Sequence, residues 1–178
     1  KHVVFADPND QAAKDLLADT YEQLGYQAEA GPWRSIYLQG ALELRKGVPS
    51  SGGTNTASPD TIRAMEPELL FNYWGVRLNA EKAAGKKGTI VFAFTDLKKQ
   101  YALRLENSTL TASERIPRDA DATVTLSKAA LDKLSLGQST ADQSIKSGEW
   151  KVAGKTELVT SFFGMLDDFP FWFNIVTP

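Results

Sequence analysis

The last eighteen residues place the strongest constraint on how this chain can fold. Residues 161–178 read SFFGMLDDFPFWFNIVTP and hold six large aromatic rings, with Met165 and Leu166 between them. Chain ends are usually polar and frayed, whereas this density of apolar rings is unfavourable in water. Burying each large apolar side chain contributes about 1.5–3 kcal/mol. The chain, a ligand or a partner must therefore supply an apolar surface for this segment.

The composition excludes several classes of protein. The chain has 178 residues, 42% of them hydrophobic and 24% charged, which is typical of a globular protein with one sizeable core or two small ones. A net charge of -2 gives no basic field, so nucleic acid is not an expected partner. No run of eighteen apolar residues occurs, so we expect a soluble chain without a membrane span. The compartment is left open, with a bacterial periplasmic or secreted location as one option.

Two residue types that carry much of enzyme chemistry are nearly missing. There is no cysteine, which excludes disulfides, thiolate zinc sites and cysteine nucleophiles. The only histidine is His2, so neither a histidine-rich metal site nor a serine–histidine triad can be assembled from this chain alone. The sequence opens on KHVVFAD without a methionine, and we expect it to be a piece of something longer.

Helical periodicity predicts two helices near the start of the chain. A strand-like apolar run over residues 3–6 precedes a helix over residues 8–24, with Gly25 as its stop. A second helix is predicted over residues 32–46. Two helices joined by a short loop form an antiparallel hairpin. We expect this hairpin, residues 1–47, to pack on another domain or on a second copy of itself, because its own core is small.

A composition change then indicates a domain boundary. Residues 48–59 (VPSSGGTNTASP) are the expected linker to a second domain over residues 60–178. In that domain an apolar period of two predicts four strands within residues 89–126 and a fifth over residues 150–153. The longer helices are predicted over residues 66–79, 127–137 and 155–166. We therefore expect an α+β domain with an antiparallel sheet of about five strands and helices on one face.

Two polar motifs each have a functional and a structural interpretation. Arg34, at the start of the second helix, would bind an anion together with free helix amides, or it would pair with a nearby acid. Asp167 and Asp168 are adjacent carboxylates in an apolar context, where one raised pKa would suit acid–base chemistry. The alternative, which we favour, is a turn between the last helix and the tail.

The apolar strand faces and the tail are either a filled core or the lining of a cavity for an alkyl chain or sterol. Periodicity does not separate these interpretations, although rigid rings leave gaps more readily than aliphatic side chains. We expect the last helix to lie against the sheet and residues 169–173 to close over the sheet's open end. The expected lining residues are Phe92, Phe94, Tyr101, Leu103, Val124, Trp150, Phe162, Phe163, Met165, Leu166, Phe169 and Trp172.

Several separated segments resemble one family, in the right order. Residues 16–47 (LLADTYEQLGYQAEAGPWRSIYLQGALELRKG) resemble the end of the dimerisation domain of alkyl sulfatases, which hydrolyse dodecyl sulfate and related esters. The segments that resemble the C-terminal domain of that family are residues 69–86 (LLFNYWGVRLNAEKAAGK), 91–110 (VFAFTDLKKQYALRLENSTL), 119–127 (DADATVTLS) and 163–178 (FGMLDDFPFWFNIVTP). That domain is similar in fold to sterol carrier protein.

The resemblance implies an enzyme of three parts. These are an N-terminal metallo-β-lactamase-like domain with two zinc ions, a helical dimerisation domain, and a sterol-carrier-like module that receives the alkyl chain. The zinc-binding cluster of histidines and aspartates has no match here. We therefore expect no catalytic residue and no cofactor in this chain, which alone would not be an enzyme. Metal-activated hydrolysis is expected in an upstream domain of the same protein.

The expected role of this chain is therefore binding. It would hold an alkyl-chain or fatty small molecule, and its helical segment would contribute to a homodimer. The alternative is a purely structural module, in which the same apolar residues form a closed core that stabilises the larger enzyme.

Overall fold

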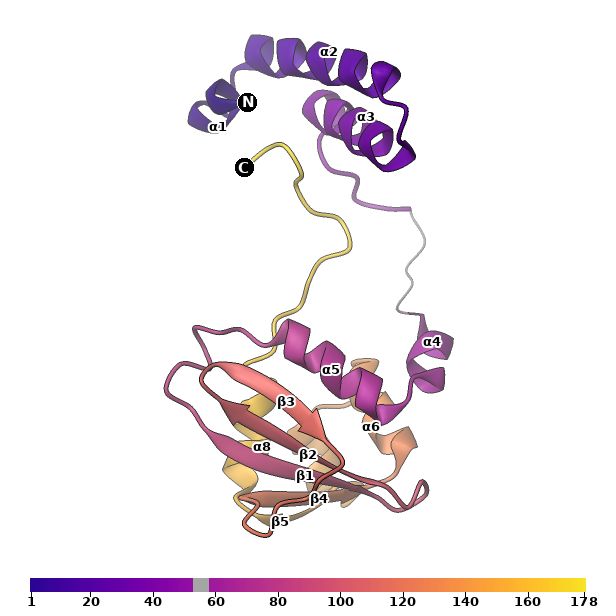
Figure 1. Cartoon of the computed structure of the whole chain (residues 1–178), viewed down its shortest axis with the longest axis vertical. Coiled ribbons are helices and arrows are strands. Elements are labelled where there is room, and N and C mark those ends of the chain that lie inside the picture. Colours follow the sequence, from indigo (N-terminus) through magenta and orange to yellow (C-terminus); the bar gives the residue numbers. More distant parts are fainter. Residues whose placement is uncertain (53–57) are drawn as a thin grey trace. The chain divides into compact units, whose positions relative to one another are not determined.

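The computed structural model describes residues 1–52 and 58–178, which form two compact units. Unit 1 contains the described residues up to Gly52 together with Pro170–Pro178, and unit 2 runs from Ser58 to Phe169 (Figure 1). The expected linker, residues 48–59, lies partly outside the described residues.

Unit 1 begins as a helical hairpin with a short leading helix. Its helices are α1 (His2–Ala6), α2 (Gln11–Gln27) and α3 (Gly31–Lys46). α2 starts where the Asp10 carboxylate accepts a hydrogen bond from the Ala13 N–H at 2.9 Å, which satisfies one of the free amides of a helix start. Both helices that periodicity predicted are therefore present.

Two details predicted for this segment are wrong. The strand-like run over residues 3–6 is the helix α1, because Val4 is buried in a cluster with side chains of α2 and α3. Gly25 does not stop α2, which continues to Gln27. A Cβ at Gly25 would lie 2.8 Å from Leu38 Cδ2, so this glycine lets the two long helices pack closely.

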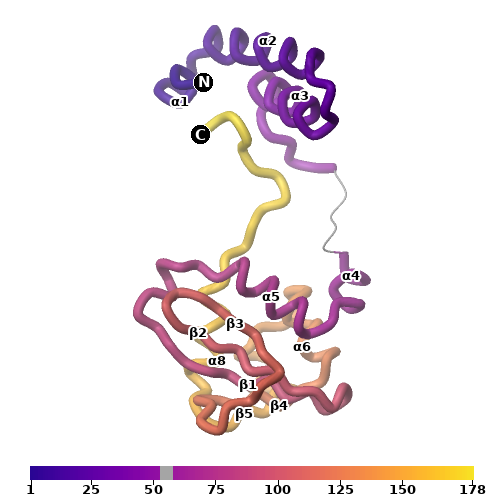
Figure 2. Tube along the Cα trace, in the orientation of Figure 1, coloured from indigo at the N-terminus to yellow at the C-terminus, as the bar shows by residue number. Residues whose placement is uncertain are grey.

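The tail, Pro170–Pro178, completes unit 1. It has no helix or strand and runs back to the hairpin, so both ends of the chain lie in this unit (Figure 2). Val176 joins Val4, Ala18, Ala41 and Leu44 in one buried cluster. The prediction that residues 169–173 close over the sheet is therefore wrong from Pro170 onward, because the groups that hold the tail are on the hairpin.

Unit 2 has the predicted α+β architecture. Its strands are β1 (Gly88–Phe94), β2 (Gln100–Glu106), β3 (Thr109–Ser113), β4 (Ala122–Leu126) and β5 (Lys151–Gly154). Its helices are α4 (Pro59–Ala64), α5 (Pro67–Arg77), α6 (Lys128–Ser135), α7 (Ala141–Lys146) and α8 (Thr156–Phe163). The five strands form one sheet in the order β3-β2-β1-β4-β5.

The sheet is mixed, whereas an antiparallel sheet was predicted. β1, β2 and β3 pair antiparallel as the predicted meander. β4 pairs with the other side of β1 in parallel, because residues 114–121 carry the chain from edge strand β3 across to the free side of β1. β5 then adds antiparallel to β4.

One face of the sheet carries the core, as expected. In β1, Phe92 is in register with Tyr101 of β2 on one side and Val124 of β4 on the other. These side chains pack with buried residues of α5 to α8, and Figure 1 shows α6 and α8 behind the sheet. The opposite face carries smaller and polar side chains, among them Thr89 and Arg104.

Candidate functional site

Ten of the twelve apolar residues predicted to line a cavity lie together in the core of unit 2. Eight of them are buried, and Phe163 and Leu166 are partly buried at its margin. Phe71 and Trp74 of α5 belong to the same cluster, although we did not include them in the predicted lining. Their spacing of three on a predicted helix was the signal that could have found them.

The rings in this core contact one another directly. The ring centroids of Phe92 and Trp150 are 6.2 Å apart, and Phe163 lies 5.2 Å from both Trp74 and Phe162. These distances are those of favourable aromatic pairs, and Phe92 is 0% exposed. The residues are brought together as predicted and fill the space between sheet and helices. That they bind an alkyl chain stays a prediction.

One polar atom in this core lacks a partner. Within the described part of the chain, the Trp150 indole nitrogen Nε1 is buried and has no hydrogen-bond partner. Leaving a buried donor unsatisfied costs about 1–3 kcal/mol. A hydrogen-bond acceptor on a bound molecule would therefore be stabilised at this position.

The remaining two predicted lining residues lie elsewhere. Phe169 is the last residue of unit 2 and is 63% exposed. Trp172 belongs to unit 1, where the tail and the end of α3 enclose a small and largely apolar niche of about 140 Å³. Its lining residues are Gln39, Glu43, Val48, Pro49, Phe171, Trp172, Phe173 and Ile175.

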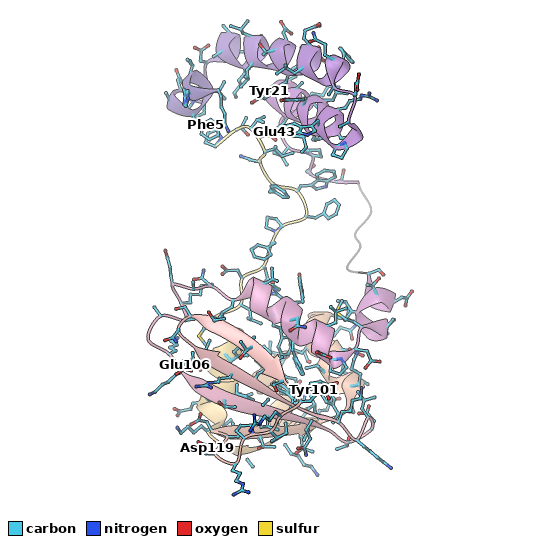
Figure 3. All side chains as sticks on the ribbon, viewed as in Figure 1. Phe5, Tyr21, Glu43, Tyr101, Glu106 and Asp119 are labelled. Atoms are coloured by element: carbon cyan, nitrogen blue, oxygen red, sulfur yellow. The ribbon has the colours of Figure 1, made fainter. Side chains whose placement is uncertain are left out.

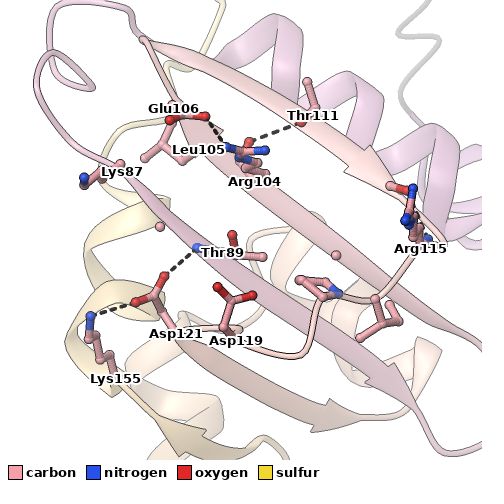
Figure 4. Close-up of a pocket in the computed structure, with 15 residues that line it drawn as sticks. Lys87, Thr89, Arg104, Leu105, Glu106, Thr111, Arg115, Asp119, Asp121 and Lys155 are labelled. Carbon is pink, nitrogen blue, oxygen red and sulfur yellow. Dashed lines mark hydrogen bonds and ion pairs between the residues drawn. The ribbon is translucent and has the colours of Figure 1, made fainter.

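A larger, polar groove of about 700 Å³ lies on the face of the sheet opposite the core (Figure 4). Its floor is formed by β1, β2 and β3, and its wall by the segment that leads from β3 to β4. The charged lining residues are Lys87, Arg104, Glu106, Arg115, Asp119, Asp121 and Lys155. The sequence analysis missed this groove, although alternate polar residues in the strands marked the face.

Four of the charged residues that line the groove form two ion pairs. Arg104 contacts Glu106 at 2.5 Å, and the Asp121 carboxylate accepts hydrogen bonds from Lys155 Nζ at 2.7 Å and from the Thr89 N–H at 2.9 Å (Figure 4). The bond from Lys155, followed by that from Thr89, holds the pKa of Asp121 below its ordinary value. This carboxylate is charged at neutral pH and suits hydrogen-bond acceptance.

The Asp167-Asp168 pair fastens the chain after α8 to the end of α5. Asp167 accepts hydrogen bonds from Lys82 Nζ and Asn79 Nδ2, both at 2.7 Å, and Asp168 pairs with Arg77. The bonds from Lys82 and then Asn79 lower the pKa of Asp167. This direction is opposite to the raised pKa of the acid–base interpretation.

Arg34 contacts the backbone of the loop between α2 and α3. Its Nε and Nη2 atoms donate to the Ala28 carbonyl oxygen at 3.1 and 2.8 Å, which ties α3 to the end of α2. Two of the five guanidinium N–H groups therefore hold the loop between the helices. An anion contact at Arg34 stays a prediction.

Among the described residues, no group of three or more His, Cys, Asp or Glu side chains is gathered in a way that could hold a metal ion. None of their helices has the length and apolar character needed to cross a membrane.

Comparisons with known proteins match both parts of the chain. A family described as "Alkyl sulfatase dimerisation" matches residues 1–47, and one described as "Alkyl sulfatase C-terminal" matches residues 55–178. A linear primary-alkylsulfatase of Pseudomonas sp is 47% identical over 99% of this chain. The chain spans 26% of that relative's length.

Solved structures give corresponding matches. The stereoselective inverting sec-alkylsulfatase Pisa1 from Pseudomonas sp. has a TM-score of 0.85 and 40% identity, with 99% of this chain and 28% of that chain covered. A ubiquinone synthesis protein, UbiJ-SCP2, has a TM-score of 0.43 and 23% identity, with 55% of this chain and 87% of that chain covered.

Proposed function

We propose, since this chain belongs to the alkyl sulfatase family, that it binds the alkyl chain of sulfate-ester substrates and contributes to a homodimer. Zinc-dependent hydrolysis of the ester would be carried out by an upstream metallo-β-lactamase-like domain, within the part of the relatives that this chain does not span. The observation that carries the proposal is the match of two alkyl sulfatase families, in order, to residues 1–47 and 55–178.

The surface of the hairpin supports the dimer. Large apolar side chains outside a core are common singly, but a concentration of them marks an interaction site. α2 and α3 expose six such side chains, and Trp33 is 61% exposed. The set is Leu16, Leu24, Tyr26, Trp33, Ile36 and Leu42. A second copy of the hairpin would remove these side chains from water.

The core of unit 2 supports an alkyl ligand through two features. Phe163 and Leu166 are only partly buried, so an alkyl chain would enter by displacing them from the margin of the core. Each buried methylene contributes about 0.8 kcal/mol, enough for a dodecyl chain to compete with these contacts. The unpartnered Trp150 Nε1 would donate to a ligand oxygen at the end of that chain.

Titration of the chain with decanol and with dodecyl sulfate, followed by calorimetry and tryptophan fluorescence, tests alkyl binding. We expect saturable binding at sub-millimolar ligand. Trp150→Phe should weaken decanol binding about fivefold, because one hydrogen bond is lost, and should leave dodecane binding unchanged. Trp33→Phe, in unit 1, is the matched control and should have no effect.

A closed structural core is the second candidate, and the ring contacts of Phe92 with Trp150 and of Phe162 with Trp74 favour it. In that case neither ligand binds saturably below the millimolar range. Unit 2 would then contribute only to the stability of the larger enzyme.

The site of catalysis needs a separate test. We expect this chain alone to show no sulfatase activity. A full-length relative should lose activity when it is treated with a chelator and regain it with zinc.

A further inference from the structure

Glu43, labelled in Figure 3, is a buried carboxylate on α3. Its hydrogen-bond donors come from the tail. The residue is 2% exposed. Its Oε2 atom accepts from the Ile175 N–H at 2.8 Å, and Oε1 accepts from the N–H groups of Val176 at 3.1 Å and Thr177 at 2.9 Å. The Thr177 hydroxyl adds a fourth bond at 2.5 Å.

This arrangement recognises a peptide through its backbone. Three successive amides donate to one carboxylate. Consecutive backbone N–H groups commonly bind an anion in this way, and the charge strengthens each hydrogen bond. A buried carboxylate without such donors is strongly destabilised. The tail and Glu43 therefore depend on each other: the tail gains an anchor, and the carboxylate gains the donors that its burial requires.

Apolar contacts set the position of the tail. Val176 is buried with side chains from all three helices of unit 1. A Cβ at Gly40 would lie 3.1 Å from Val176 Cγ1, so the glycine leaves room for this side chain. We call the surface that holds the tail the tail seat; it consists of Val4, Ala18, Gly40, Ala41, Glu43 and Leu44.

We propose that the tail seat is a peptide-binding site whose ligand is the C-terminal segment of the same chain, and that docking of this segment completes the fold of the hairpin. Unit 1 then consists of two segments, the hairpin before unit 2 in the sequence and the docked tail after it. If the hairpin forms the proposed dimer, which rests on the proposed function, the dimer contact also depends on residues at the other end of the chain.

Hydrogen exchange of the full chain, measured residue by residue by NMR, tests the tail seat. The amides of Ile175, Val176 and Thr177 should be protected. Glu43→Gln should lower their protection about tenfold, because a charge-assisted acceptor is lost, and should lower the protection of α2 and α3 in parallel. The strands of unit 2 should not change. Glu29→Gln, an exposed glutamate between the same helices, should leave all protection as it is.

A milder variant tests the same contact in case Glu43→Gln unfolds unit 1. Thr177→Val keeps the shape of the side chain but removes its hydroxyl bond to Glu43, and it should reduce protection of the same three amides by a smaller factor. Wild-type amides at residues 175–177 that exchange at unprotected rates would overturn the proposal. So would protection that disappears on dilution, because the seat would then be filled by the tail of a second copy.

Sedimentation of the same samples separates this proposal from the dimer. Protected tail amides in a monomeric chain would support the tail seat and contradict dimerisation. A dimer whose tail amides are unprotected would support dimerisation and contradict the tail seat.

Discussion

At the residue scale, Glu43 connects the stability of unit 1 to pH. Burial alone raises the pKa of this carboxyl, but the hydrogen bonds from the Thr177 hydroxyl and from the three tail amides outweigh burial and lower the pKa from its ordinary value of 4.5. A carboxyl whose pKa is lower in the folded state stabilises the fold above its unfolded pKa. That stabilisation is lost as the pH falls through the folded pKa.

We predict that acid loosens unit 1 through this group. Between pH 7 and about pH 3, the protection of the tail and hairpin amides should fall, and Glu43→Gln should make this acid dependence shallower. Exchange measured across this range checks the prediction, with Glu29→Gln as the control that keeps the wild-type profile. Equal acid dependence in the wild type and in Glu43→Gln would contradict it.

Among the glycines that the structure describes, Gly154 is the one where a side chain is least acceptable. Its φ is 94°, and a Cβ there would lie 2.4 Å from the Asp121 carbonyl oxygen. We predict that Gly154→Ala destabilises unit 2 by more than the roughly 1–3 kcal/mol of backbone strain alone, because β5 must move away from β4. Urea unfolding measures this change.

Gly137→Ala is the matched control for Gly154. Gly137 also has a positive φ, of 68°, but a Cβ there would meet nothing within 4 Å. Gly137→Ala should therefore cost only the strain of the left-handed backbone, about 1–2 kcal/mol. If both substitutions lower the free energy of unfolding equally, the contact of the new Cβ with the Asp121 carbonyl oxygen does not contribute to the loss of stability.

Single residues differ in how far the sequence predicted their roles. The alternation of Phe92 and Phe94 in a strand correctly placed both side chains on the core face. The burial of Glu43 could not be predicted in this way, because a glutamate within the charged segment LELRK is expected to lie exposed on the helix surface. Its donors lie more than 130 residues away along the chain, and no local pattern records that contact.

At the element scale, periodicity predicted the two helices of the hairpin and the five strands, because each buries one face. Strand pairing depends on more than local pattern. β4 lies beside β1 in parallel, and only the path of residues 114–121 across the sheet decides that. The same path creates the polar groove, so the groove could not be predicted once the sheet was expected to be wholly antiparallel.

The contact between the end of α5 and the chain after α8 has an expected pH dependence. Hydrogen bonds from Lys82 and Asn79 lower the pKa of Asp167, so this contact stabilises unit 2 above the unfolded pKa of an aspartate and weakens as the pH falls through the folded pKa. We predict that Asp167→Asn lowers the stability of unit 2 at neutral pH and reduces its loss in acid. Urea unfolding at a series of pH values measures both changes.

Asp168→Asn is the matched control, because Asp168 is far more exposed than Asp167. Surface ion pairs of this kind contribute little, so the effect should be smaller. If Asp167→Asn leaves stability and its pH dependence unchanged, Asp167 does not fasten these elements.

At the scale of the whole molecule, the order of segments along the chain differs from their grouping in the structure. The family boundaries place the tail with the C-terminal domain, whereas the structure groups Pro170–Pro178 with the hairpin. The aromatic density of the tail predicted burial of its rings, and the structure shows this only in part. Phe171 and Phe173 are 48% and 65% exposed, and Val176 is the buried residue of Pro170–Pro178. The sequence analysis assigned the tail to the sheet, because the sheet and the hairpin both offer apolar side chains. What distinguishes the two surfaces is Glu43 on the hairpin, which accepts hydrogen bonds from the tail amides.

The last prediction concerns the proposed dimer. Interface residues that dominate association are most often Trp, Tyr or Arg, and their truncation weakens binding by about 2 kcal/mol or more, roughly thirtyfold. Trp33 and Ile36 are three residues apart on α3, both exposed, so they lie on one side of the helix. We predict that replacing both by serine raises the dimer dissociation constant at least to this extent, as measured by analytical ultracentrifugation. Val76→Ser on α5 removes a side chain that is 72% exposed in unit 2 and should leave the dissociation constant unchanged. A larger effect of Val76→Ser than of the double substitution would move the dimer contact from the hairpin to unit 2.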